Sequence, residues 1–104
     1  MSVPRQGEIW WAEAQDKRRP VLVVTRSEAV EVLRRIVVAP VTRTVRGIPT
    51  EIALGPDDGL PTDCAASFDN LQPVSRNLLT ERVSALGPQR RREICAALDA
   101  LADC

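Results

Sequence analysis

The feature that most constrains the fold of this chain is a series of short apolar runs, three of which fall within its first 42 residues. They occupy residues 7–11, 19–24 and 37–42, and each carries a polar residue at one end. Short runs rich in β-branched residues and bounded by proline, glycine or charge are typical of buried strands. Because Arg19 and Thr42 stand at the ends of two such runs, their side chains could meet across a sheet and form a site for an anionic substrate.

The rest of the chain continues this pattern, and its eight prolines and five glycines fall mostly between apolar runs. Residues 27–34 permit either a short helix or an extended segment, and we expect the helix. Apolar residues recur at helical spacing after Gly87 and Pro88, which predicts an amphipathic C-terminal helix over residues 88–101. We expect a β-rich α+β domain with strands near residues 8–14, 20–25, 35–42, 50–54, 64–69 and 80–84, and turns at 46–49 and 55–59.

Size and composition limit the classes of protein to which the chain can belong. At 104 residues with 44% hydrophobic content, the chain can build one hydrophobic core, and we expect residues 1–104 to form a single domain. Its three cysteines lack paired spacing and it has no histidine, so we expect no metal and no cofactor. Because no apolar run suits a signal peptide or a membrane-spanning helix, we expect a cytoplasmic protein with no membrane contact.

Charge is balanced over the whole chain but not along it. The formal net charge is zero, which argues against nonspecific polyanion binding through bulk charge. Residues 1–50 carry nine basic and five acidic residues, whereas residues 51–104 carry five basic and nine acidic residues. A basic groove can exist on a neutral protein if the fold gathers the first half on one face, whereas the fields cancel if the halves intermix.

Arg19 and Thr42 are the best candidates for binding a phosphate. Pro20 biases Arg19 toward an extended conformation, and a guanidinium held in this way can grip a phosphate with two hydrogen bonds. The Thr42 hydroxyl could donate to the same phosphate. From spacing alone, a surface ion pair for Arg19 and an ordinary strand end for Thr42 remain open as alternatives.

Several short motifs resemble, in their order and spacing, those of the MazF/PemK family of bacterial toxins, which are metal-independent endoribonucleases of toxin–antitoxin systems. No single motif is specific, but together they cover essentially the whole chain. The matching segments are Gly7–Trp11, Arg19–Pro20, Pro40–Thr42, Gly59–Leu60, Asp69–Asn70, Arg82–Val83 and the helix over residues 88–101.

The resemblance implies a fold and a function. The family fold is a twisted antiparallel sheet, a small barrel of the MazF/CcdB type with helices against it, and members form homodimers with RNA across the dimer groove. The implied function is a sequence-specific, metal-independent endoribonuclease that cleaves single-stranded RNA through a 2′,3′-cyclic phosphate and is inhibited by a MazE-like antitoxin. The family's catalytic arginine and threonine match Arg19 and Thr42. We expect an electrostatic role for Arg19, because a guanidinium is a poor base.

Further residues are candidates for RNA binding. Single-stranded RNA is commonly read by stacking bases on aromatic rings and by amides at base edges. One of Trp10 and Trp11 faces the core if the strand alternates, which leaves the other for stacking. Family members often have serine at the position of Cys64, for which the nearby Ser67 could substitute in part. The expected contacts are Lys17, Arg18 and Arg43 for phosphates, with Ser67, Asn70 and Gln72 for the rest of the RNA.

One departure from the family pattern leaves rival functions open. Most members have a long, glycine-containing loop that covers the site before the Arg-Pro pair, whereas this chain has only residues 12–18 there. One rival is a nuclease-dead module that binds RNA or antitoxin. The other is a DNA gyrase poison of the CcdB type, which shares the fold and cleaves nothing, although the Arg-Pro and Pro-x-Thr motifs favour the nuclease.

Overall fold

The structure is a computed structural model that describes residues 3–14 and 17–102. All strand pairs are antiparallel, in the order β4-β5-β3-β2-β1-β7, and β6 pairs with β3 off this path. The strands are β1 (Glu8–Ala14), β2 (Lys17–Val23), β3 (Arg35–Thr42), β4 (Glu51–Leu54), β5 (Cys64–Ser67), β6 (Gln72–Ser75) and β7 (Leu79–Ala85). The helices are α1 (Ser27–Val30) and α2 (Pro88–Leu101), and 3₁₀ turns span Pro56–Asp58, Phe68–Asn70 and Arg76–Leu78.

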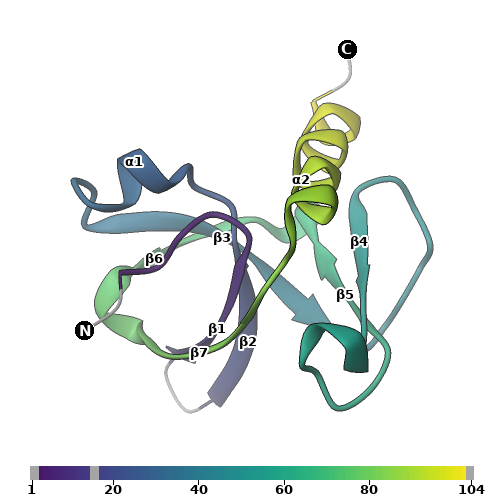
Figure 1. Ribbon diagram of the computed structural model, residues 1–104, viewed down its shortest axis with the longest axis horizontal. Coiled ribbons are helices and arrows are strands. Elements are labelled where there is room, and N and C mark those ends of the chain that lie inside the picture. The colour runs from purple at the N-terminus through teal and green to yellow at the C-terminus, as the bar shows by residue number, and fades with distance from the viewer. Residues whose placement is uncertain (1–2, 15–16, 103–104) are drawn as a thin grey trace.

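The sheet curls because β3 changes partners along its length. Val38 pairs with β2 on one side and with β6 on the other, whereas Val41 pairs with Ala66 of β5. Figure 1 shows the result, with β4 and β5 on one side of the molecule and β1, β2 and β7 on the other. The expected β-rich architecture with a twisted antiparallel sheet and a C-terminal helix is confirmed.

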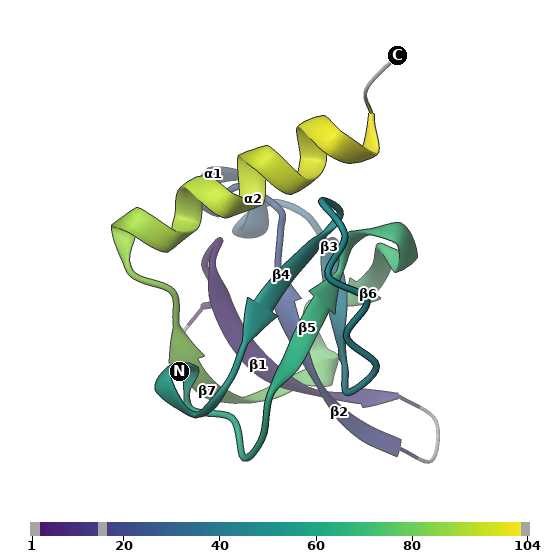
Figure 2. The same ribbon diagram turned by 90° about the vertical axis from the view of Figure 1, so that its right-hand side faces the viewer.

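Both faces of the central strands are buried, which explains why their sequences read as nearly continuous apolar runs. One face packs against α2, which Figure 2 shows crossing one end of the sheet, and the other face packs against Val30 of α1. The first cluster includes Ile9, Leu22, Ala39, Phe68, Ile94 and Ala97, and the second includes Trp10, Val21, Val23, Ile36 and Val38.

The C-terminal helix has the expected bounds and is fixed at its first turn by ion pairs. Arg90 has the unfavourable sign for a helix N-terminus. Its guanidinium lies 2.9 Å from an Asp58 oxygen and 2.6 Å from a Glu93 oxygen, and these acids offset that unfavourable sign. Leu101 belongs to the expected apolar face but is 41% exposed, so the buried stripe ends before it. Within the described residues, no helix is long and apolar enough to cross a membrane.

Several element boundaries differ from those expected from the sequence, three of them with a clear physical reason. β2 begins at Lys17 instead of residue 20, because its charged end continues the ladder with β1 as far as the Ala14–Lys17 pair. β5 ends at Ser67 instead of residue 69, because the chain turns there into a 3₁₀ turn. The helix expected over residues 27–34 is a single turn, since Val32, which is 79% exposed, offers it no buried apolar contact.

β6 is a strand that the sequence pattern does not predict, because Gln72 and Pro73 are poor strand formers. The proline is tolerated because β6, among the described strands, pairs only with β3 and therefore forms an edge. The predicted turn at residues 55–59 is present, with the Gly55 amide donating to Asp58 Oδ2 over 3.1 Å. It ends at Gly59, whose φ of +84° favours glycine.

Candidate active site

Arg19 and Thr42 occupy facing positions at the point where β2 and β3 separate. The ladder between these strands ends at the Val21–Pro40 pair, and the same register continued by two residues sets Arg19 opposite Thr42. Residues two apart on a strand point to the same face, so both side chains lie on one face of the sheet. The structure brings them together along the wall of an open groove of about 790 Å³.

The opposite wall of this groove comes from the segment that connects β5 to β6. That segment reaches the groove because the end of β3 pairs with β5 instead of β2. Six of the eight site residues expected from the sequence line the groove, whereas Lys17 and Arg18 do not. Its full lining is Arg19, Pro20, Pro40, Val41, Thr42, Arg43, Ser67, Asp69, Asn70, Leu71 and Gln72.

The Arg19 side chain is available to bind an anion. It is exposed, and within residues 3–14 and 17–102 it forms no ion pair or hydrogen bond. Its backbone is fixed by the ladder, in which Arg19 pairs with Ala12 of β1. A guanidinium on a rigid strand with free donors is suited to two-point binding of a phosphate.

The Thr42 hydroxyl is oriented by the backbone that follows β3. The Thr44 amide donates a hydrogen bond of 3.1 Å to Thr42 Oγ1, which uses one lone pair of the oxygen. The hydroxyl hydrogen remains free to point into the groove and donate to a phosphate oxygen. The half-buried position of Thr42 restricts its side chain to the groove wall.

The far wall of the groove is organised by hydrogen bonds among its polar residues. Ser67 is 2% exposed, and its Oγ accepts a bond of 2.9 Å from Asn70 Nδ2. Ser67 therefore orients the Asn70 amide, whose oxygen and second hydrogen remain for a ligand. Asp69 also lines the groove and accepts a bond of 2.6 Å from Thr50 Oγ1. Sequence reasoning noted the Asp69–Asn70 motif but did not place Asp69 in the site, where it adds a carboxylate acceptor.

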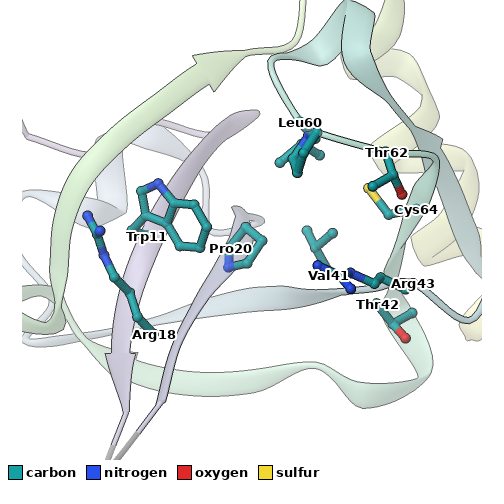
Figure 3. A pocket seen from close by; sticks show the side chains of 10 residues that line it. Trp11, Arg18, Pro20, Val41, Thr42, Arg43, Leu60, Thr62 and Cys64 are labelled. Carbon is teal, nitrogen blue, oxygen red and sulfur yellow. The ribbon is translucent and has the colours of Figure 1, made fainter.

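Arg18 lies on the other face of β2 and is held by protein groups. Its Nη2 atom is 2.5 Å from Glu81 Oε2, its Nε atom is 3.5 Å from Glu13 Oε1, and its guanidinium carbon is 4.9 Å from the centre of the Trp11 ring. Figure 3 shows Trp11 between Arg18 and Pro20 beside a second, smaller pocket. Strand alternation leaves Trp11 half-buried there and places Trp10 in the core, as the sequence predicts for one of the two.

Arg43 lines both the groove and the second pocket, because it follows Thr42 at the end of β3. Within the part of the chain that the structure describes, its exposed side chain forms no ion pair. Its charge is felt by the neighbouring Cys64, where it acts against the larger effects of burial and of Asp58 and Asp63. Together these raise the pKa of the Cys64 thiol, which is therefore neutral and a poor nucleophile.

Glu8 is the centre of a charged cluster that links the start of β1 to β7. Glu8 is 9% exposed, and its carboxylate accepts hydrogen bonds from the Arg5 amide, Trp10 Nε1 and Arg82 Nη1. These bonds join the start of β1 to β7 and lie outside the groove. Among residues 3–14 and 17–102, no three histidine, cysteine or acidic side chains converge as a metal site would require.

Comparisons with known proteins agree with this architecture. Residues 5–102 match the family model described as PemK-like, MazF-like toxin of type II toxin–antitoxin system. The chain is 42% identical over 105 residues to a probable endoribonuclease MazF5 of Mycobacterium tuberculosis, covering 99% of this chain and 96% of that protein. It is 37% identical over 101 residues to a probable endoribonuclease MazF2 of the same organism, covering 96% and 99%.

Solved structures show the same relationship. The Mycobacterium tuberculosis toxin MazF-mt6 superposes with a TM-score of 0.84 at 32% identity, over 92% of this chain and 96% of that chain. A mycobacterial endoribonuclease in complex with its cognate antitoxin superposes with a TM-score of 0.81 at 26% identity, over 93% and 92%. The curled sheet and the C-terminal helix are thus those of known toxins, and this chain belongs to the PemK-like, MazF-like toxin family of type II toxin–antitoxin systems.

Proposed function

We propose that this chain is a sequence-specific endoribonuclease that cleaves single-stranded RNA without a metal ion and leaves a 2′,3′-cyclic phosphate. The observation that carries the proposal is the placement of two groups along one wall of a single groove. One is the Arg19 guanidinium, which no side chain of the described residues engages, and the other is the Thr42 hydroxyl. The naming of two close relatives as probable endoribonucleases supports the same activity.

In the proposed reaction the 2′-oxygen attacks the adjacent phosphorus. The new P–O2′ bond forms as the P–O5′ bond breaks, the 2′-hydroxyl proton passes to water, and the departing O5′ takes a proton from water. Negative charge grows on the non-bridging oxygens, where the Arg19 guanidinium and the Thr42 hydroxyl donate hydrogen bonds. Guanidinium groups stay protonated in proteins, so Arg19 acts by neutralising charge and aligning the phosphate, and not as a base.

The partners follow from the same groove. We infer that two copies form a homodimer and that RNA lies across the groove between them. An acidic, partly disordered segment of a MazE-like antitoxin then competes with RNA for Arg19 and Arg43. A mycobacterial endoribonuclease has been solved in complex with its cognate antitoxin, which supports such a complex.

Incubation of the purified protein with a long single-stranded RNA in excess EDTA tests the activity. The Arg19→Ala variant runs alongside, with Arg92→Ala as a matched control, since Arg92 is an exposed residue of α2 outside the groove. Discrete cuts with cyclic-phosphate ends are expected from the wild type and from Arg92→Ala, but not from Arg19→Ala. Intact RNA in every lane would refute the nuclease and make DNA gyrase supercoiling the next assay.

A further inference from the structure

The β4–β5 hairpin, residues 51–67, is joined to the rest of the sheet by a short ladder. Among the described residues two register pairs connect it to β3, and one of them joins Thr42 to Ala65. Thr42 therefore keeps its place in the groove only while the hairpin keeps its own. Apolar packing helps to fix the hairpin, since Ile52 and Leu54 belong to the buried cluster that packs against α2. Such packing is non-directional, so polar contacts are needed to set the exact position of the hairpin.

The turn that connects β4 to β5 is held by Asp58. The Asp58 carboxylate accepts hydrogen bonds from the Gly55 amide over 3.1 Å and from Arg90 Nη1 over 2.9 Å. Its backbone oxygen accepts a hydrogen bond from Ser84 Oγ of β7. Asp58 therefore ties the turn both to α2 and to β7.

Arg90 contacts the same hairpin at a second point. Its Nη2 atom donates a hydrogen bond of 2.5 Å to the carbonyl oxygen of Ala53, on the edge strand β4. Its Nε atom donates to Glu93 Oε2 over 2.6 Å, which fixes the guanidinium relative to α2. One guanidinium thus joins α2 to the strand and to the turn of the hairpin, beneath the helix in Figure 2.

A row of backbone pairs leads from Arg90 to Thr42. Ala53 of β4 pairs with Ala65 of β5, and Ala65 pairs with Thr42 of β3. Neighbouring strands lie about 4.8 Å apart, so the backbones of Ala53 and Thr42 are about 10 Å apart. Arg90 is not among the residues that line the groove. A displacement of β4 would nevertheless be passed across β5 to the strand end that carries the Thr42 hydroxyl.

We propose that Arg90 is a positioning residue that, together with Asp58, fixes the β4–β5 hairpin and through it holds Thr42 in the groove. Arg90 acts without touching the RNA, because the contacts that it makes are with the hairpin and with its own helix. The effect on cleavage rests on the proposed function, whereas the effect on the hairpin does not.

Hydrogen exchange of backbone amides, followed by NMR, measures the placement of Thr42 without RNA. In Arg90→Ala the amides of residues 41–42 and 64–67 should exchange about tenfold faster than in the wild type, because the hairpin opens more often. Arg82→Ala is the matched control, since Arg82 forms an ion pair of 3.2 Å with Glu8 outside the groove, and it should leave these amides unchanged. Unchanged exchange at these amides in Arg90→Ala would overturn the proposal.

Single-turnover cleavage in the Thr42→Val background separates positioning from a general loss of stability. Misplacing a catalytic group by about 1 Å can cost about 10²-fold in rate, so Arg90→Ala should slow the wild type by about 10- to 100-fold. It should slow Thr42→Val by less than about twofold, because the hydroxyl that Arg90 positions is already absent. Equal losses in the two backgrounds would mean that Arg90 does not act through Thr42, and the proposal would be wrong.

Asp58→Asn is a milder variant, which serves if Arg90→Ala does not fold. The asparagine oxygen can still accept from the Gly55 amide, but the charge that faces Arg90 is lost. Exchange and cleavage should change in the same directions as in Arg90→Ala, by smaller factors. Wild-type exchange and a wild-type rate in Asp58→Asn would count against the proposal.

The two measurements also separate this inference from the proposed function. Faster exchange around Thr42 in Arg90→Ala, in a protein that cuts no RNA, would sustain the positioning role and refute the nuclease. Cleavage of RNA by the wild type, with unchanged exchange in Arg90→Ala, would sustain the nuclease and refute the positioning role.

Discussion

Replacing Arg19 with alanine is expected to lower the rate of RNA cleavage about 10²- to 10⁴-fold. The guanidinium is exposed in the groove and can place two charge-assisted hydrogen bonds on one phosphate, each worth about 1.5–3 kcal/mol. Their sum, about 3–6 kcal/mol, corresponds to that loss because about 1.4 kcal/mol is a factor of ten. Arg19→Lys keeps the charge but loses the two-point geometry. Its rate of cleavage should therefore fall between the rates of the wild type and of Arg19→Ala.

The same substitution should leave the fold unchanged. Within residues 3–14 and 17–102 the Arg19 side chain forms no ion pair or hydrogen bond, and the ladder with Ala12 uses only its backbone. Exposed substitutions of this kind usually change the free energy of unfolding by no more than about 0.5 kcal/mol. Urea denaturation of Arg19→Ala and wild type should therefore give midpoints that nearly coincide.

Single-turnover cleavage of a short RNA in EDTA, with enzyme in excess, measures the chemical step apart from product release. A loss of less than about tenfold in Arg19→Ala, with an unchanged urea midpoint, would show that Arg19 does not bind the scissile phosphate. Activity in Arg19→Lys no higher than in Arg19→Ala would show that charge alone contributes nothing.

Three further predictions concern other residues. Thr42→Val should slow single-turnover cleavage about 10²–10³-fold, the usual effect of losing one transition-state donor, and Thr42→Ser should retain most activity; equal rates for both would exclude a hydroxyl role. Glu8→Gln should lower the free energy of unfolding in urea by about 1–3 kcal/mol, because the buried carboxylate accepts three hydrogen bonds, whereas the exposed control Glu28→Gln should not. Iodoacetamide at pH 7 should label the exposed Cys95 well before Cys64, whose thiol pKa is raised by burial; equal labelling in peptide mass maps would contradict this.

The strands of the fold could be predicted from local patterns because both faces of the central sheet are buried. Apolar runs bounded by proline, glycine and charge marked β1, β2 and β3 without reference to the rest of the chain. β6 could not be predicted in this way, because Pro73 is acceptable only on an edge strand. Which strand forms an edge depends on how all the strands of the sheet pair, and local sequence does not contain that information. The start of β2 at Lys17 could not be predicted either, since Lys17 pairs with β1 through its backbone, whatever its side chain.

The wall of the groove that carries Arg19 and Thr42 could be predicted from the sequence. The opposite wall, from the segment between β5 and β6, could be predicted only in part. Arg19 directly precedes the apolar part of β2 and Thr42 ends β3, so their convergence requires only that these two adjacent strands pair. Asp69 enters the groove because β3 leaves β2 for β5, which is a long-range choice of partner. The two halves of the chain thus both contribute to the groove, which is lined by Arg43 from the basic half and by Asp69 from the acidic half. Sequence charge alone therefore could not predict the local field.

Arg18 and Arg19 are neighbours in sequence whose environments differ, and the salt dependence of RNA binding should tell them apart. Arg18 forms an ion pair with Glu81, which is 63 residues away in sequence. Local sequence patterns could not predict this ion pair. Each phosphate contact on single-stranded RNA adds about −0.7 to the slope of log affinity against log salt. With an RNA made uncleavable by deoxyribose at the cleavage site, Arg19→Ala should reduce the slope by about that amount, whereas Arg18→Ala should leave it unchanged because Glu81 already neutralises Arg18. Equal losses of slope would mean that RNA displaces Glu81, and Arg18 would then be a phosphate contact as the sequence predicts.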